Sequence, residues 1–237
     1  MIKVNITNMK RIAENNMKKI IILILIFIFI PIPIKVFATL PLSGKVILID
    51  AGHGEFDPGK IGDGDVLEKD INLKISLKLQ SMLEMADAYV LLTRSEDKAL
   101  GDTKNKDMQG RRYISNISEA DVLLSIHQNA FTTPKPSGAI VFYYNEKGTS
   151  KILANYIQKY MGEDLERSSG REARKNTSYY ILRKTTIPAI LIECGFLTNP
   201  QDLNLLKTDE YQEKVALAIY KGLVDYFNYQ YELEEAK

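Results

Sequence analysis

The sequence predicts a single α/β domain, built on an open, mostly parallel, twisted sheet of about six strands with helices on both faces. Short apolar runs that suit buried strands alternate with longer segments whose apolar residues recur at helical spacing. Glycines or polar residues close several of these runs, as expected where a chain turns from a strand into a helix. With 237 residues, 45% of them hydrophobic, the chain can bury one sizeable core.

The first predicted strand covers residues 45–50, which are apolar almost throughout and are followed by Gly52 and Gly54. Such a run is typical of a strand buried on both faces. Residues 70–85 carry apolar residues at helical spacing and predict a helix that covers the sheet. The same patterns continue the alternation, with strands expected at 88–93, 121–126, 138–144 and 189–193 and helices at 107–117, 150–161 and 209–229.

The N-terminal segment, residues 1–38, is predicted to be an export signal or a membrane anchor. The stretch Ile20–Ile30 is wholly apolar, two lysines precede it, and the small-residue pattern ending at Ala38 fits a cleavage site. Because the unbroken run is shorter than the roughly 20 residues of a bilayer span, a cleaved signal is favoured. Met17 is a second candidate start. The remaining divisions are a linker at 39–43, one folded domain at 44–231 and an acidic tail at 232–237.

The charge balance and the single cysteine narrow the class of protein. With 31 basic and 30 acidic residues, the net charge of +1 gives no reason to expect nucleic acid as a partner. An exported protein can use disulfides, but Cys194 is the only cysteine of the chain. Its stability must therefore come from a large core, with a bound metal as a second source.

Both histidines of the chain follow apolar, strand-like runs, His53 in ILIDAGHGEFDPG and His127 in LLSIHQN. Open α/β folds build their sites where the carboxyl ends of parallel strands meet. Glu68 lies at the start of the next predicted helix, and two imidazoles with one carboxylate form a typical catalytic zinc set. Taken singly, each residue has a plainer explanation as a core histidine or a helix-start acid. Their shared placement predicts zinc at the strand ends.

Glu193, in PAILIECGF, ends another buried apolar run. A carboxylate there is costly unless it is paired or functional. We predict that Glu193 is a general base, which takes a proton from the attacking water and delivers it to the departing nitrogen. The alternative is a structural carboxylate satisfied by backbone amides or by Arg183.

Two other enzyme classes fit the sequence less well. Residues 54–60, GEFDPGK, have the spacing of a phosphate loop, but Ile61 replaces the expected Ser or Thr and the two acids would repel phosphate. Cys194 could serve a cysteine hydrolase. It directly follows Glu193, however, so in an extended strand the two side chains point to opposite faces. A buried unpaired cysteine is usually a small apolar filler.

Four segments in order carry a family resemblance: IDAGHGEFDPGKIG with LEKDINL, then LTR, ADVLLSIHQNA and PAILIECGFLTNP. They are similar to the motifs of the zinc-dependent N-acetylmuramoyl-L-alanine amidases, over about residues 44–226 of the predicted catalytic domain, 44–231. The resemblance implies zinc on the two histidines and Glu68, Glu193 as the catalytic acid/base, and peptidoglycan as the substrate. The bond cut would be the amide between the lactyl group of N-acetylmuramic acid and L-alanine. Candidate substrate contacts are Asn129 and Arg183.

The compact, repeat-free form with an export signal resembles, within that family, the germination-specific amidases of endospore formers, the CwlD type. The resemblance implies removal of stem peptides from spore cortex, toward muramic-δ-lactam, in the cell wall or the forespore intermembrane space. Gln128 and the short basic segment 165–185 depart from the family pattern. Alternatives are a vegetative cell-wall amidase (autolysin) and an inactive, zinc-stabilised wall-binding protein, which would need no Glu193. An exported accessory or activator protein is a further expectation, with membrane contact only through an uncleaved N-terminal segment.

Overall fold

The computed structural model describes residues 15–19, 40, 42–146 and 148–236. The chain divides into two compact units, Met1–Ala38 and Thr39–Lys237. In the first unit the described residues form a helical turn at 15–19. Most of the predicted export segment lies outside the described residues. Within the described part of the chain, no helix has the length and hydrophobicity required to cross a membrane.

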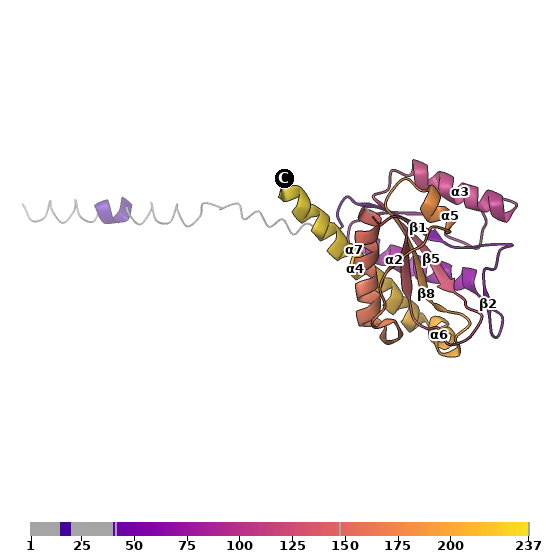
Figure 1. Cartoon of the computed structure of the whole chain (residues 1–237). Helices are drawn as coiled ribbons and strands as arrows, with labels where there is room; N and C mark the ends of the chain where they lie inside the picture. The colour runs from indigo at the N-terminus through magenta and orange to yellow at the C-terminus, as the bar shows by residue number, and fades with distance from the viewer. Residues whose placement is uncertain (1–14, 20–39, 41, 147, 237) are drawn as a thin grey trace, which may run out of the picture. The chain divides into compact units, whose positions relative to one another are not determined.

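A six-stranded sheet forms the centre of the second unit (Figure 1). Its strands are β1 (Val46–Ala51), β4 (Tyr89–Leu92), β5 (Val122–Asn129), β6 (Ile140–Tyr143), β7 (Arg174–Lys175) and β8 (Ala189–Phe196). They lie in the order β4-β1-β5-β8-β6-β7, and only the pairing of β6 with β8 is antiparallel. The predicted open, mostly parallel sheet is confirmed. A separate hairpin joins β2 (Ile61–Gly62) to β3 (Val66–Leu67).

Helices cover both faces of the sheet, as predicted. One face carries α2 (Glu68–Met85), α4 (Thr149–Asp164) and α7 (Asp209–Glu235), and α7 packs against both α2 and α4. The other face carries α3 (Lys104–Ile117) and the short α5 (Tyr180–Lys184). The remaining helices are the 3-10 turn Glu166–Ser168 and α6 (Pro200–Leu206), which packs beside β8 and α7.

Alternation along the strands divides the core into two layers. In β1, Ile47 and Ile49 join the large cluster under α2, α4 and α7, whereas Leu48 between them faces the smaller cluster under α3 and α5. Successive side chains of a strand point to opposite faces, so an apolar run is needed where both faces are covered. This explains why β1 is apolar almost without interruption.

The structure moves several predicted boundaries. Helix α2 begins at Glu68, two residues earlier than expected, so that Glu68 is the first helical residue. Strand β8 continues past Glu193 to Phe196, and α7 runs to Glu235, so most of the predicted acidic tail is helical. The hairpin, β7, α5 and α6 were not predicted, because elements of two to seven residues are too short for a clear periodicity.

Candidate active site

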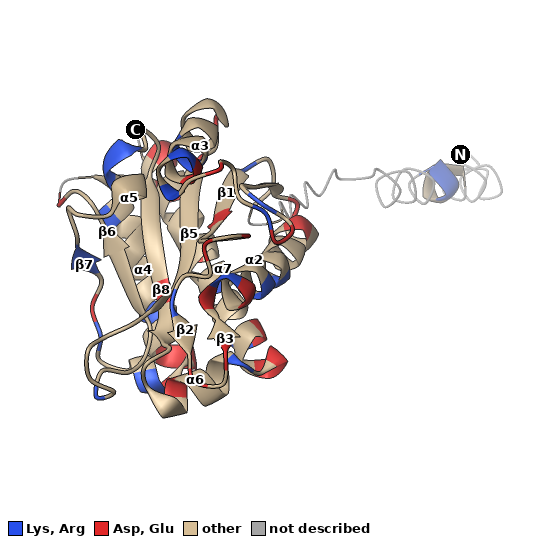
Figure 2. Cartoon of the chain, turned by 90° about the vertical axis from the view of Figure 1, so that its right-hand side faces the viewer, with Lys and Arg blue, Asp and Glu red and all other residues tan. Residues whose placement is uncertain are grey.

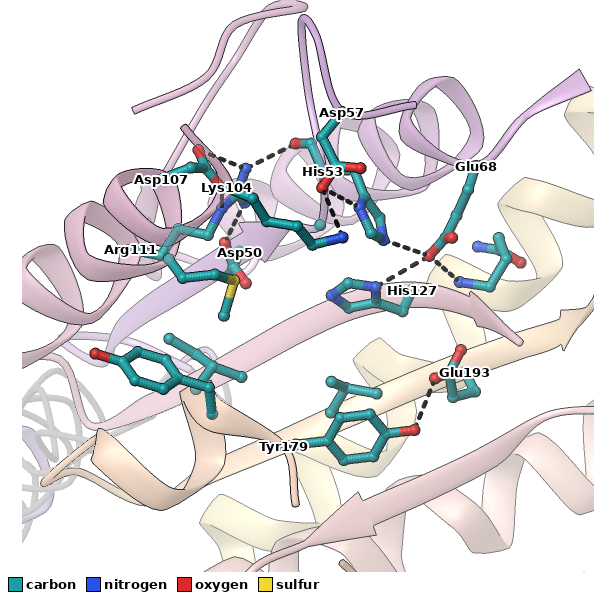
Figure 3. Close-up of a pocket in the computed structure, with 16 residues that line it drawn as sticks. Asp50, His53, Asp57, Glu68, Lys104, Asp107, Arg111, His127, Tyr179 and Glu193 are labelled. Atoms are coloured by element: carbon teal, nitrogen blue, oxygen red, sulfur yellow. Dashed lines mark hydrogen bonds and ion pairs between the residues drawn. The ribbon is translucent and has the colours of Figure 1, made fainter. Parts of the chain in front are cut away.

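The predicted site residues come from three neighbouring strands and one helix start. His53 lies two residues after the end of β1, and His127 lies near the end of β5. Glu193, on β8, is paired in register with His127. Since β1, β5 and β8 are adjacent in the sheet, their ends meet at one edge. Glu68 reaches the same place as the first residue of α2 (Figure 3).

The two histidines and Glu68 converge as a set of metal donors. Oε1 of Glu68 lies 3.2 Å from Nε2 of His53 and 3.0 Å from Nδ1 of His127. The candidate ligand atoms of all three residues lie within 4.8 Å of one another. Donors bound to a tetrahedral zinc at about 2.0–2.1 Å stand roughly 3.3 Å apart. The donor chemistry and the spacing therefore both fit zinc.

Two glycines make room for this cluster. A Cβ at Gly52 would overlap the His127 ring, and a Cβ at Gly59 would lie 2.6 Å from Oε2 of Glu68 and 2.7 Å from Cδ2 of His53. Gly59 also has φ +69°, a conformation that favours glycine. His53 itself has φ 63°, which turns the chain sharply after β1. The glycine-rich turn is thus shaped around the imidazoles and the carboxylate.

Asp57, which the sequence analysis did not single out, orients His53. Its Oδ2 lies 2.8 Å from Nδ1 of His53, which leaves Nε2 facing Glu68. Burial by itself would lower the pKa of His53, but hydrogen bonds and negative charge from Glu68 and Asp57 raise it above its ordinary value. The four-residue spacing from His53 to Asp57 was the available signal, and a carboxylate behind a ligating histidine is a common arrangement.

Glu68 is held by several donors besides the histidines. Oε2 accepts a hydrogen bond from the Lys60 amide at 2.7 Å, and Oε1 accepts one from the Gln128 amide at 3.1 Å. The Asn72 side chain also donates to Oε1 and is in turn an acceptor for the Gln128 side chain. Burial raises the pKa of Glu68, but its hydrogen bonds and attraction to the histidines outweigh burial and hold the pKa far below the usual range. The carboxyl is an anion, as a metal ligand must be.

Glu193 has a different environment although it lies beside this cluster. It is 6% exposed, and Oε1 accepts a hydrogen bond from the Tyr179 hydroxyl at 3.1 Å. Oε2 has no hydrogen-bond partner among the described residues. Burial, the main cause, raises the pKa of Glu193 to about 7, with the charge of Glu68 acting in the same direction. A carboxyl with a pKa near neutrality and a free oxygen suits proton transfer.

Two buried arginines fix the backbone that carries His53. Arg94 donates to the carbonyls of Ala51 and Gly52, and Arg111 donates to the carbonyls of Ala51 and His53. Arg111 also pairs at 2.7 Å with Asp50, whose pKa its charge helps to lower to about 2 against the opposing effect of burial. The turn after β1 is therefore anchored from two sides. The sequence does not predict the burial of Arg111, because an arginine on a helix is usually exposed.

The donors open onto a cavity of about 350 Å³. One side is formed by α3, and the opposite side by the segment around Tyr179 (Figure 3). That side belongs to the predicted basic segment, 165–185, whose charges are visible on β7 and beside α5 in Figure 2. The cavity-lining residues that carry charge or aromatic rings, besides the donors and Glu193, are Asp50, Asp57, Lys104, Asp107, Arg111, Tyr179 and Tyr180.

The structure does not bring the two candidate substrate contacts to this cavity. Asn129 ends β5, where its carbonyl accepts the Leu197 amide and its side chain accepts the amide of the next residue. Arg183 is exposed on α5, and neither residue lines the cavity. The partner of Glu193 is Tyr179 and not Arg183, contrary to the structural alternative considered for that carboxylate.

The two rival enzyme classes find no support in the geometry. Cys194 is fully buried in the large core cluster, and burial raises the pKa of its thiol well above the ordinary value. After residues 54–60 the chain enters the β2–β3 hairpin instead of a helix, and the Lys60 amide bonds a carboxylate. A thiolate nucleophile and a phosphate cradle both conflict with these contacts.

Two imidazoles and a carboxylate lie at the carboxyl edge of the parallel sheet, beside the buried Glu193, whose pKa is about 7. This combination of a metal donor set and a proton-transfer group is typical of a hydrolase. Comparison with known proteins gives the family. The family model described as N-acetylmuramoyl-L-alanine amidase matches residues 47–225, most of the second unit. The chain belongs to this family and is an N-acetylmuramoyl-L-alanine amidase, an enzyme that acts on peptidoglycan, as the sequence motifs predicted.

Individual relatives agree with this assignment. The chain is 40% identical over 197 residues to the germination-specific N-acetylmuramoyl-L-alanine amidase of Bacillus subtilis, covering 80% of this chain and 82% of that protein. It is similar to the CwlD amidase of Clostridioides difficile, solved in complex with the GerS lipoprotein, with a TM-score of 0.75, 39% identity and coverage of 78% and 98%. A second amidase, from Clostridium difficile 630, has a TM-score of 0.71, 33% identity and coverage of 78% and 97%.

Proposed function

We propose that this amidase is zinc-dependent, with the metal held by Nε2 of His53, a carboxylate oxygen of Glu68 and Nδ1 of His127. The observation that carries the proposal is the convergence of these three donors beside the unpaired oxygen of Glu193. Three protein ligands leave a coordination position for substrate or water, as in catalytic zinc sites. A bound zinc ion would supply Lewis acidity toward the scissile carbonyl.

Three side chains of the site have distinct roles in the reaction. Glu193, ionised above about pH 7, takes a proton from the attacking water on Oε2 and then gives it to the departing amide nitrogen. Tyr179 holds the other oxygen of Glu193 by its hydroxyl. Asp57 keeps Nδ1 of His53 occupied, so that Nε2 faces the donor cluster. Contacts of Asn129 and Arg183 with a longer substrate stay predictions.

Mass spectrometry of peptidoglycan digested by the purified protein tests this function. We expect stem peptides with a free L-alanine amino terminus, and we expect them to disappear with chelator and return with zinc. Glu193→Ala, analysed for metal, is the second arm. Bound zinc with hydrolysis lost supports the mechanism, whereas bound zinc with muropeptide release at the wild-type rate would contradict it. An inactive wall-binding protein would release no peptide in any arm.

We further propose a role in spore cortex, where removal of stem peptides precedes formation of muramic-δ-lactam. The support is the germination-specific relative, which the chain matches over most of both lengths. Deleting the gene in a spore-forming host and analysing the cortex tests the role. Loss of muramic-δ-lactam with normal vegetative walls is expected. Normal cortex with altered vegetative walls would favour the alternative, a vegetative amidase.

The cellular location and partner are proposals as well. We propose that the catalytic domain, 44–231, lies outside the cytoplasmic membrane. In the chain it follows an export signal or anchor at 1–38 and a linker at 39–43, and an acidic tail at 232–237 follows it. An exported accessory protein is supported by the similar CwlD amidase, which was solved in complex with a lipoprotein. Full zinc occupancy and full activity of the isolated chain would remove the need for such a partner.

A further inference from the structure

We propose that Lys104 forms a carboxylate subsite that recognises the second residue of the stem peptide. Lys104 is the first residue of α3 and lines the catalytic cavity. The inference rests on the proposed function, because it concerns the substrate of the same site. In peptidoglycan the second stem residue is a glutamate joined through its side chain, so its α-carboxyl is free unless it is amidated. The subsite would distinguish these two forms.

Lys104 is the available cation among the described residues that line the cavity. The other cavity-lining cation, Arg111, is buried, and its nitrogens are committed to Asp50, Asp107 and the carbonyls of the His53 turn. The Lys104 side chain is 69% exposed, and the one anion that it contacts among the residues described by the structure is Asp57, at 3.4 Å. An ammonium has three donors. At least two of them remain for a ligand.

The reach from the reaction centre fits the second residue. Lys104 Nζ lies 3.4 Å from Oδ2 of Asp57, and the same oxygen lies 2.8 Å from Nδ1 of His53. An imidazole ring and a zinc–nitrogen bond of about 2 Å complete the path, so the ammonium stands no more than roughly 10 Å from the metal position. Two extended residues span about 7 Å. An ion pair of about 3–4 Å covers the remaining distance, so a carboxylate two residues beyond the scissile amide can reach Lys104. In Figure 3 the ammonium of Lys104 points toward His53 and His127.

Binding a substrate carboxylate would not dismantle the donor cluster. Asp57 keeps its hydrogen bonds to His53 and to the Gly59 amide, at 2.8 Å and 3.2 Å, if the longer contact with Lys104 loosens. Asp57 is 16% exposed and accepts these two hydrogen bonds, whereas the Lys104 side chain is 69% exposed. The lysine can thus turn toward the substrate while the histidine keeps its orientation.

Neighbouring Lys106 provides a matched control. It lies two residues away on α3, is 62% exposed, contacts Asp102 at 2.8 Å and does not line the cavity. The experiment measures kcat/KM on two synthetic muramyl peptides that differ only in a free or an amidated α-carboxyl at the second stem residue. Wild type, Lys104→Ala, Lys104→Arg and Lys106→Ala are compared, and the zinc content of each protein is measured.

We expect wild type to prefer the free carboxyl by about fivefold, the upper range for an exposed ion pair. Lys104→Ala should lose that preference with unchanged zinc content, while Lys104→Arg and Lys106→Ala keep it. Equal loss on both peptides would overturn the proposal, because Lys104 would then act through Asp57 and His53. A wild type without preference would overturn it too. Failure to cleave either peptide would instead contradict the proposed function.

Discussion

Replacing Glu193 with glutamine should make the metal-free protein more stable at neutral pH. The Glu193 carboxyl has a pKa of about 7 in the folded protein against 4.5 for an ordinary glutamate, mainly because it is buried. A raised folded pKa favours the folded state below pH 4.5, and this contribution is lost as pH rises through about 7. The shift corresponds to about 3 kcal/mol at pH 8. Glutamine is neutral throughout and can still accept the Tyr179 hydrogen bond.

Urea unfolding of chelated protein, measured from pH 4 to pH 8, tests this value. The free energies of unfolding of wild type and Glu193→Gln should nearly coincide at pH 4 and diverge by about 3 kcal/mol at pH 8. Glu213→Gln, which changes an exposed carboxylate on α7, is the control and should follow wild type. A difference that stays constant across the range would refute the assignment of a raised pKa. With zinc added, the same variant should lose hydrolysis by about 10²–10⁴-fold.

Three further predictions concern neighbours of the site. Tyr179→Phe removes the hydrogen bond that lowers the pKa of Glu193. The ascending, acidic limb of the pH–rate profile, where Glu193 becomes ionised, should therefore move to higher pH with zinc content unchanged. Gly59→Ala places a methyl group against Glu68 and His53 and should weaken zinc binding at least tenfold in a competition assay. Its control is Gly64→Ala, also at positive φ but in open space, which should lower the free energy of unfolding by only about 1 kcal/mol and leave zinc binding intact. Cys194→Ala should lose about 1 kcal/mol of stability and no activity, and loss of hydrolysis would restore the cysteine-hydrolase alternative.

The sequence was sufficient for the parts of the fold and site that depend on local pattern. The apolar runs located β1, β5 and β8, and the polar residues at their ends predicted which side chains would gather. Burial on both faces enforces such runs, so the signal is strong. The antiparallel pairing of β6 had no local signature, because strand direction depends on how distant segments cross the sheet.

The residues that support the site were harder to predict. Tyr179 lies in an irregular stretch before α5, and Asn176, whose side chain accepts the Ser178 and Tyr179 amides, sets its position. Its contact with Glu193 joins segments that only the tertiary fold brings together. Arg111 is similar, since its partners Asp50 and His53 lie about 60 residues earlier in the chain. Such contacts are long-range and leave no periodic trace in the sequence.

The residues that carry the proposed chemistry and much of the cavity wall come from different parts of the fold. The ends of β1, β5 and β8 sit at the middle of the sheet, where every strand has neighbours on both sides. The walls of the cavity come from α3 and the segment before β8, which lie outside those pairings. Exposed wall residues such as Lys104 can therefore change without moving the donors, whereas Arg111 and Tyr179 are constrained because they hold the His53 turn and Glu193. Evolution can retarget such an enzyme to new muropeptides by rebuilding its walls, with the bond it cuts unchanged.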